Sequence, residues 1–177
     1  MPTIPARSAR PDATEYAPFY ASYVANVPEE DVLAALRSSG RELATMLSAV
    51  PESRGGHRYG DGKWSIREVA GHLIDAERIF SYRALRVARG DTTPLPAFDE
   101  NEYVRNAGSD TRTLADLAEE LALVREGSLR LFTSLPSEAW TRRGVASGKE
   151  VTVRALAYIT AGHARHHARI LRERYGL

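Results

Sequence analysis

Three of the five histidines in this chain lie within five residues, as His163, His166 and His167. In a helix, residues four apart lie about 40° apart around the axis, so His163 and His167 share one face. The apolar residues of the same segment, such as Leu156 and Ala164, occupy that face, whereas His166 lies outside its centre. The spacing predicts that His163 and His167 point into the protein as a pair and that His166 does not.

An inward histidine pair at i and i+4 can hold a first-row transition metal. Two ligands make a weak site, and His72 offers a third imidazole at the edge of an apolar stripe on another expected helix. Three imidazoles would leave positions for water or substrate, as in catalytic metal sites. The alternative is that these histidines are hydrogen-bonded core residues, and spacing alone does not choose between the two.

Three carboxylates near His72 are candidates for catalytic roles. Glu68 and Asp75 lie about one helical turn before and after His72, so either could reach the metal, although both also suit a solvated helix surface. Glu77 falls inside the apolar face, where an unpaired carboxylate costs several kcal/mol. It is expected either to pair with an inward arginine or to line a pocket below the metal. Ala164 stands where a His-Glu-x-x-His motif would place its general base.

Four amphipathic segments are expected to position these side chains, each with apolar residues at helical spacing. A capping box of Ser65 and Glu68 precedes the second segment, Thr113 and Asp116 suggest another before the third, and Thr152 caps the fourth. No segment shows the alternation of a strand, and a loop is expected before Thr152. The pattern predicts an all-α, four-helix bundle with long inter-helix links. The helices are expected at residues 29–49, 66–89, 114–134 and 153–175.

Residues 1–28 are predicted to form an N-terminal arm outside the bundle domain, which would comprise residues 29–177. The arm contains five prolines, up to Pro28, and a short helical turn is expected near residues 16–24. Pro28 is expected to stand at the start of the first long helix, because proline suits the first helical position.

Composition excludes several functions. The chain has 24 basic and 23 acidic residues, so no basic excess points to a nucleic-acid partner. No apolar run approaches the roughly 20 residues needed to cross a bilayer, and residues 1–7 lack the apolar stretch of a secretory signal. Cysteine is absent, so the protein supplies no thiolate of its own. A cytoplasmic location is the default expectation.

Two segments resemble the DinB/YfiT-like superfamily of metalloenzymes: Lys63-Trp-Ser-Ile-Arg-Glu-Val-Ala-Gly-His72, continuing to Glu77, and Tyr158-Ile-Thr-Ala-Gly-His163-Ala-Arg-His-His167, continuing to Leu171. The linker at residues 96–103 is also similar. The resemblance spans residues 29–176 and leaves out the arm. It implies a four-helix bundle with one divalent ion, typically nickel or zinc, held by His72, His163 and His167.

Some members of this superfamily are S-transferases that use bacillithiol or mycothiol. The resemblance therefore implies a metal-dependent transferase that activates a small-molecule thiol for attack on an electrophile. The alternatives are a metal-dependent hydrolase and a non-catalytic, stress-associated metal-binding protein. The resemblance is compatible with a homodimer.

The aromatic residues Trp64, Phe98, Tyr103 and Trp140 either rim a substrate pocket or pack at the ends of the bundle. Gly71 and Gly162, each next to an expected ligand, cost roughly 1 kcal/mol each within a helix. They would admit either a close helix contact or a substrate.

Overall fold

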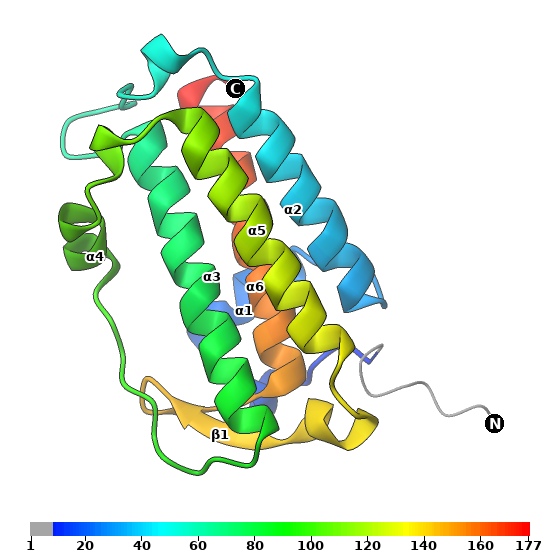
Figure 1. Cartoon of the computed structure of the whole chain (residues 1–177). Coiled ribbons are helices and arrows are strands. Elements are labelled where there is room, and N and C mark those ends of the chain that lie inside the picture. The colour runs from blue at the N-terminus through cyan, green and yellow to red at the C-terminus, as the bar shows by residue number, and fades with distance from the viewer. Residues whose placement is uncertain (1–8) are drawn as a thin grey trace.

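Four long helices form a bundle in the computed structural model, which describes residues 9–177 (Figure 1). The predicted all-α fold is confirmed, and each expected helix is present within a few residues of its expected bounds. The first eight residues of the predicted arm lie outside the described residues. The long helices are α2 (Val32–Ser48), α3 (Ile66–Ala88), α5 (Leu114–Thr133) and α6 (Val153–Tyr175).

The helix order in the bundle explains the longest link. Helices α2 and α3 each pack against both α5 and α6, so α2 and α3 lie on one diagonal. Figure 1 shows α3 and α5 running in the same direction, opposite to α2 and α6. Because α3 and α5 are parallel neighbours, the chain between them must return along the length of the bundle. Residues 89–113 make this return and carry the short helix α4 (Glu100–Asn106).

The predicted caps explain most of the helix ends. Ser65 and Glu68 form the complete capping box of α3, and the Thr152 side chain accepts a hydrogen bond at the start of α6. Thr113 caps α5, but only its own half of the expected box is present. The first long helix begins later than predicted. Val32, not Pro28, is its first residue, and Asp31 is its N-cap, because the Asp31 carboxylate accepts the backbone N–H of Leu33.

A β-hairpin replaces the loop expected before α6. Strand β1 (Arg143–Ala146) pairs antiparallel with β2 (Lys149–Thr152). Ser147 and Gly148 join the strands with positive φ at both positions, as in a type I′ turn. The strands are only four residues long, which is too short for alternation to stand out. Leu95 bridges to Ala146, so the hairpin tip is held against the link between α3 and α5.

The part of the predicted arm that the structure describes packs into the bundle. It contains short 3-10 helices at Ala13–Glu15 and Pro18–Tyr20, followed by α1 (Ala21–Ala25), which packs against α6. Val24 and Val27 are buried in the core. A Cβ at Gly162 would overlap the backbone carbonyl of Tyr23, so the glycine permits this contact. Gly71 is similarly close to Ser109, which shows that both glycines serve close packing.

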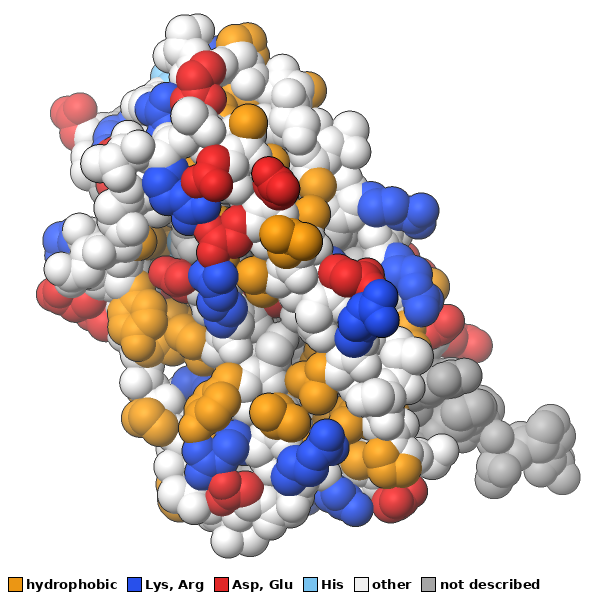
Figure 2. Space-filling model, viewed as in Figure 1, with side chains coloured by type: hydrophobic (Ala, Val, Ile, Leu, Met, Phe, Trp, Pro, Cys, Tyr) orange, Lys and Arg blue, Asp and Glu red, His pale blue; other side chains and the backbone are white. Residues whose placement is uncertain are grey.

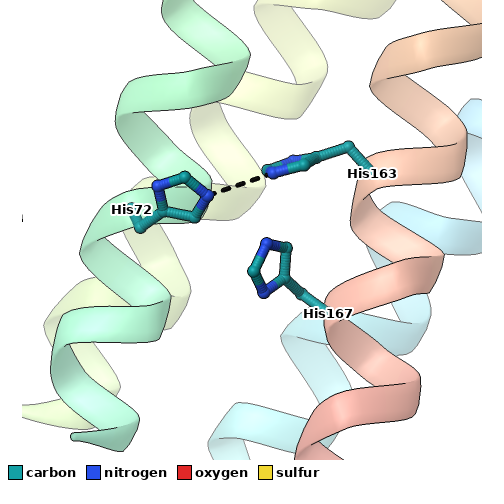
Figure 3. Close-up of side chains that lie close together, drawn as sticks. All are labelled: His72, His163 and His167. Carbon is teal, nitrogen blue, oxygen red and sulfur yellow. Dashed lines mark hydrogen bonds between the residues drawn. The ribbon is translucent and has the colours of Figure 1, made fainter. Parts of the chain in front are cut away.

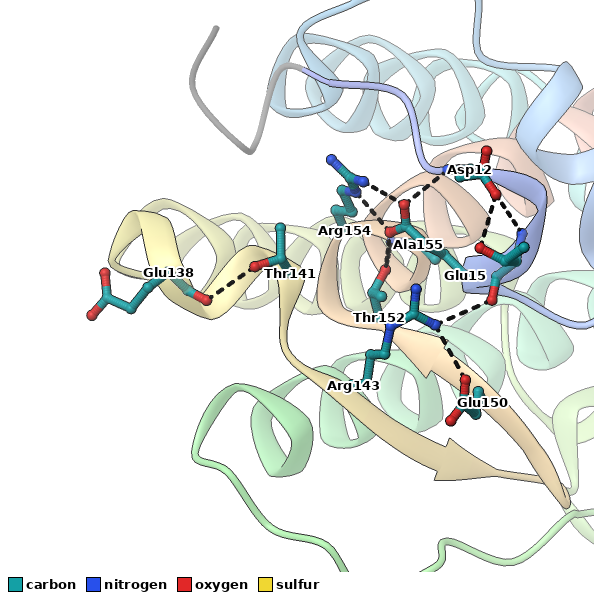
Figure 4. A network of polar contacts seen from close by, with 10 residues as sticks. Asp12, Glu15, Glu138, Thr141, Arg143, Glu150, Thr152, Arg154 and Ala155 are labelled. Carbon is teal, nitrogen blue, oxygen red and sulfur yellow. Dashed lines mark hydrogen bonds and ion pairs between the residues drawn. The ribbon is translucent and has the colours of Figure 1, made fainter. Parts of the chain in front are cut away.

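A buried carboxylate anchors the same segment to the start of α6 (Figure 4). Glu15 pairs with the guanidinium of Arg154, whose Nε lies 2.7 Å from Oε2. The hydroxyl of Thr152 donates to the same oxygen at 2.7 Å. Burial opposes ionisation of Glu15, but the hydrogen bonds from Arg154, Asp12 and Thr152 outweigh it and lower its pKa. Residues 9–28 are thus fixed beside α6.

A polar layer divides the interior into two apolar clusters. One cluster contains Phe80, Phe132 and Tyr158, and the other contains Leu43, Leu117 and Leu171. Between them, the long helices contribute buried polar side chains. These are Ser39 from α2, His72 and Glu77 from α3, Arg125 and Ser128 from α5, and His163 and His167 from α6.

The surface carries charges of both signs. Figure 2 shows basic and acidic side chains interspersed over α3 and α5, with apolar side chains between them. Some form exposed ion pairs, such as those of Arg78 and Arg112 with Glu120. Within residues 9–177, no helix has both the length and the apolar character required to traverse a bilayer.

Candidate metal centre

His72, His163 and His167 converge in the polar layer, between α3 and α6 (Figure 3). One ring nitrogen from each histidine lies within 4.8 Å of those of the other two. The Nε2 atoms of His72 and His163 face each other at 3.1 Å. The i, i+4 spacing on α6 and the stripe on α3 therefore bring together the three imidazoles that the sequence singled out. His166 is not part of this group.

Burial keeps the three imidazoles neutral. Their exposed fractions are 8% for His72, 6% for His163 and 8% for His167. Burial is the main cause that lowers the pKa of His72 to about 4. It also holds the pKa values of His163 and His167 well below the ordinary value, and the neighbouring histidines lower them further. Neutral imidazoles have a free lone pair, which is the form that binds a metal ion.

The donor set and its spacing fit a transition-metal ion. Bonds of about 2.0–2.1 Å from a tetrahedral metal to two imidazole nitrogens would place those nitrogens about 3.3 Å apart. The 3.1 Å between the Nε2 atoms of His72 and His163 is close to this value. The Nδ1 atom of His167 is buried and has no hydrogen-bond partner among residues 9–177. Imidazole suits zinc, nickel, copper and iron better than magnesium or calcium.

The candidate carboxylates lie elsewhere. Glu68 belongs to the capping box of α3 and pairs with Arg58. Asp75 is half-buried beside Arg78, and burial raises its pKa. It lines a separate surface hollow next to α4.

Glu77 forms the structural ion pair that was one of its two expected roles. Its carboxylate accepts two hydrogen bonds from Arg125, from Nε at 2.6 Å and from Nη2 at 2.8 Å. The remaining Nη1 of Arg125 donates to the Leu36 carbonyl at 2.6 Å and to the Ser39 hydroxyl at 2.9 Å. Both charged side chains are buried between α2, α3 and α5, and each nitrogen of the Arg125 guanidinium has a hydrogen-bond acceptor within the protein.

A cavity of about 300 Å³ opens beside the three histidines. Aromatic side chains form most of its wall: Phe19, Tyr20, Tyr23, Trp64, Phe80 and Phe98. Its polar lining outside the three histidines comes from Glu100, Ser147 and His166. Phe19 and Glu100 are exposed, so the cavity reaches the surface. The space suits a small organic molecule with one end at the imidazoles.

Two of the four aromatic residues considered for a pocket rim, Trp64 and Phe98, line this cavity. Trp140 packs in the core against Phe132, and Tyr103 lies in the surface hollow beside Asp75.

Several cavity residues escaped the sequence analysis. Phe19, Tyr20 and Tyr23 belong to the segment interpreted as an arm, although their helical spacing was a signal that they share a face. The ring of Tyr23 lies edge-on to His163, with 5.4 Å between centroids. Burial is the first cause that raises the pKa of Tyr23, followed by nearby Tyr20 and Glu100. For Glu100, the sequence indicated only a position in the linker at residues 96–103, and no role in a site.

Comparison with known sequences identifies the family. The sequence model of the DinB superfamily matches residues 35–171, which is most of the chain. The chain belongs to the DinB superfamily. The matched range includes His72, His163 and His167 together with all but the outer ends of the four long helices. No curated protein sequence matches the chain.

Solved structures share the DinB superfamily fold at low sequence identity. One of them is YfiT from Bacillus subtilis, which is described as a probable metal-dependent hydrolase with an unusual four-helix bundle topology. It matches with a TM-score of 0.74 at 19% identity, and the match covers 92% of this chain and 94% of YfiT. The mycothiol-dependent maleylpyruvate isomerase has a TM-score of 0.68 at 17% identity and covers 82% of this chain. The match covers only 61% of the isomerase. The colibactin self-resistance protein ClbS, solved with double-stranded DNA, has a TM-score of 0.58 at 18% identity, covering 81% of this chain and 95% of that chain.

Proposed function

We propose that this DinB superfamily member binds one divalent transition-metal ion, zinc or nickel, through His72, His163 and His167. We propose further that it is an enzyme that activates a low-molecular-weight thiol for attack on an electrophile. The observation that carries the proposal is the convergence of three buried, neutral imidazoles at an aromatic cavity that reaches the surface. A metal-binding protein without turnover would not require this cavity.

An ion held by His72, His163 and His167 would keep positions for a further ligand, and as a Lewis acid it would lower the pKa of a thiol or water bound there. The residues of this chain supply the surroundings. The ring of Trp64 packs against His72, and the rings of Phe80 and Tyr23 pack against His163, so aromatic side chains shield the imidazoles from water. Exclusion of water strengthens electrostatic interactions inside the cavity.

The surroundings favour a thiol over water as the nucleophile. Once its proton is lost, a thiol sulfur attacks an electrophilic carbon directly, whereas hydrolysis usually needs a general base beside the water. Of the carboxylates near His72 in sequence, Glu68, Asp75 and Glu77 all lie outside the cavity wall. The chain has no cysteine, so the sulfur must come from a cosubstrate. The similarity in fold to a mycothiol-dependent isomerase supports this choice.

Hydrolysis is the second candidate, and Glu100 is the observation that favours it. This residue supplies the one carboxylate in the cavity wall among residues 9–177, and it could accept a proton from an attacking water. The description of YfiT as a probable metal-dependent hydrolase supports the same alternative.

Elemental analysis of untagged protein tests the metal site. We expect one zinc or nickel ion per chain in the wild type and in His57→Ala, since His57 is exposed and remote from the cluster. His72→Ala should lose the ion. Absence of metal from the wild type, even after reconstitution, would refute the site and both enzymatic candidates.

Activity assays then separate the two candidates. Conjugation of small thiols to monochlorobimane, lost in His72→Ala, would support the transferase. Hydrolysis of nitrophenyl acetate without any thiol, lost in both His72→Ala and Glu100→Gln, would support the hydrolase instead.

A further inference from the structure

Arg83 is a buried cation without an anionic partner. Only 3% of its surface is exposed, and no carboxylate among residues 9–177 forms an ion pair with it. Its Nη2 donates to the Pro96 carbonyl at 2.8 Å and to the Ser147 hydroxyl at 3.0 Å. The guanidinium also lies over the ring of Phe98, 5.7 Å from the centroid. Its Nε and Nη1 donate to no protein group in the described residues.

The other arginine that is fully buried in residues 9–177 is neutralised, because Arg125 pairs with Glu77. The half-buried Arg154 likewise pairs with Glu15, and both carboxylates are themselves buried. Burial of an uncompensated ion is strongly unfavourable, so a buried guanidinium is ordinarily retained with a counter-charge. The environment of Arg83 therefore lacks one negative charge.

Arg83 lies directly behind the wall of the histidine cavity, in contact with two residues that line it, but it is not itself a lining residue. It follows His72 by eleven residues on α3, which is about 20° around the axis and about 16 Å along it, in line with Ala76 and Phe80 of the cavity wall. Ser147, which accepts a hydrogen bond from Arg83, and Phe98, whose ring lies under the guanidinium, both line the cavity.

We propose that Arg83 and Ser147 bind a carboxylate of the electrophilic substrate. This inference rests on the proposed transferase function and specifies its substrate: a small molecule with its carboxylate at Arg83 and its reactive carbon toward the histidines. The Ser147 hydroxyl would donate to the carboxylate from the cavity wall, and the Arg83 guanidinium behind it would supply the counter-charge. Glu100 has the opposite charge, but it is exposed and screened by water, whereas Arg83 acts from the interior.

The thiol has a separate space. His167 and Trp64 also line a second cavity of about 240 Å³, whose wall includes Lys63 and Asn101. The two cavities therefore lie on either side of a wall that Trp64 and His167 form. A thiol that enters from the second cavity leaves the first free for the electrophile, so the carboxylate at Arg83 belongs to the electrophile.

Binding of benzoate and benzamide tests the subsite, because the two probes share an aromatic ring and differ in charge. In ligand-detected NMR titrations of the full chain, we expect benzoate to bind at least tenfold more tightly than benzamide. Arg83→Gln should remove this preference and leave benzamide unaffected, and Arg83→Lys should retain part of it. Arg86→Gln is the matched control, since Arg86 lies on the same helix but pairs with Asp91.

Each titration is run on chelator-treated and on zinc-loaded protein. A preference for benzoate that needs zinc and persists in Arg83→Gln would mean that the metal binds the carboxylate, and it would overturn the proposal. Equal affinity of the wild type for both probes would also overturn it, whether or not the variants fold. The chelated samples do not depend on the metal site, so failure of the proposed function and failure of this subsite are distinguishable.

Discussion

The polar layer of the bundle contains two buried polar groups that are organised in opposite ways. Glu77 and Arg125 satisfy each other with two hydrogen bonds, and Leu36 and Ser39 take up the remaining donor. In the histidine cluster, one short contact joins His72 to His163, and Nδ1 of His167 has no partner in the described chain. The ion pair has no unpaired group that a ligand could bind. The histidines, in contrast, have unpaired nitrogen lone pairs beside a cavity.

The difference teaches where to look for chemistry in a helical interior. Glu77 and His72 are neighbours on α3, but five residues turn the helix by about 140° beyond a full turn, so Glu77 faces α5 and His72 faces α6. The two groups still influence each other. The charge of Arg125 is among the causes that lower the pKa of His163. Buried polarity is therefore structural where it is paired and a candidate for function where it is not.

Disruption of the ion pair should have the largest effect on stability. Glu77→Gln leaves the Arg125 guanidinium buried without a counter-charge, and we expect the free energy of unfolding to fall by about 3–5 kcal/mol. Urea denaturation measures the loss. Metal content should stay at one ion per chain, because Glu77 does not face the cavity.

The matched control is Glu120→Gln, which breaks exposed ion pairs with Arg78 and Arg112 and should cost less than about 1 kcal/mol. The double variant Glu77→Leu, Arg125→Met should recover much of the stability, since a buried ion pair replaced by apolar side chains is often neutral. Loss of metal from Glu77→Gln at full folding would contradict the separation of the two groups.

The sequence predicted the helices and the histidine cluster because both depend on local periodicity. The i, i+4 pair on α6 and the stripe of His72 on α3 follow from 3.6 residues per turn, and the caps at Ser65 and Thr152 are defined within four residues. The two expected roles of Glu77 also followed from its place on an apolar face. The sequence could not identify Arg125 as the partner, because the pairing depends on how α3 and α5 meet.

The cavity wall was harder to predict because it is built from segments with little periodicity. Tyr23 reaches the site because Gly162 allows α1 to lie directly on α6, a contact that neither segment reveals alone. Ser147 reaches it through a hairpin of two four-residue strands. Glu100 begins a helix of only seven residues. Such placements depend on tertiary packing, which propensity and hydrophobic pattern do not specify.

Acid should destabilise the histidine cluster when no metal is present. The pKa of His72 is about 4 in the folded protein and about 6.5 when unfolded, so between these values the unfolded chain binds the proton. The free energy of unfolding should therefore fall as pH drops from about 6.5 to about 4, by about 3 kcal/mol from His72 alone. His163 and His167 shift in the same direction and add to the slope.

Denaturation of the metal-free protein across this pH range measures the effect. His72→Leu should flatten the slope relative to the wild type. A slope that is the same in both proteins would show that His72 is not kept neutral by burial.

Gly162→Ala should disturb the packing of α1 over the histidine cluster and leave the Glu77–Arg125 ion pair intact. Its Cβ would meet the backbone of Tyr23, which cannot move without displacing α1 from α6. We expect a loss of about 1–2 kcal/mol, since overpacking outweighs the higher helix propensity of alanine. Gly127→Ala on α5 is the control, because open space surrounds that position, and it should gain up to about 1 kcal/mol. Thermal unfolding compares the two variants, and equal shifts would contradict the close contact.

His166→Ala should have the smallest effect and gives the sharpest test of the cluster. His166 is half-buried on the cavity wall, with ring centroids 5.2 Å from both Tyr23 and His167, yet its nitrogens do not join the group of three. We expect His166→Ala to retain one ion per chain, with an affinity within about threefold and a stability change within about 1 kcal/mol. His167→Ala, one residue away, should lose stoichiometric metal while its helical circular dichroism stays largely intact. Elemental analysis and titration against a chromophoric chelator measure both variants. Because the two histidines are adjacent in sequence and differ by about 100° around α6, the reverse result would mean that the wrong face of the helix holds the metal.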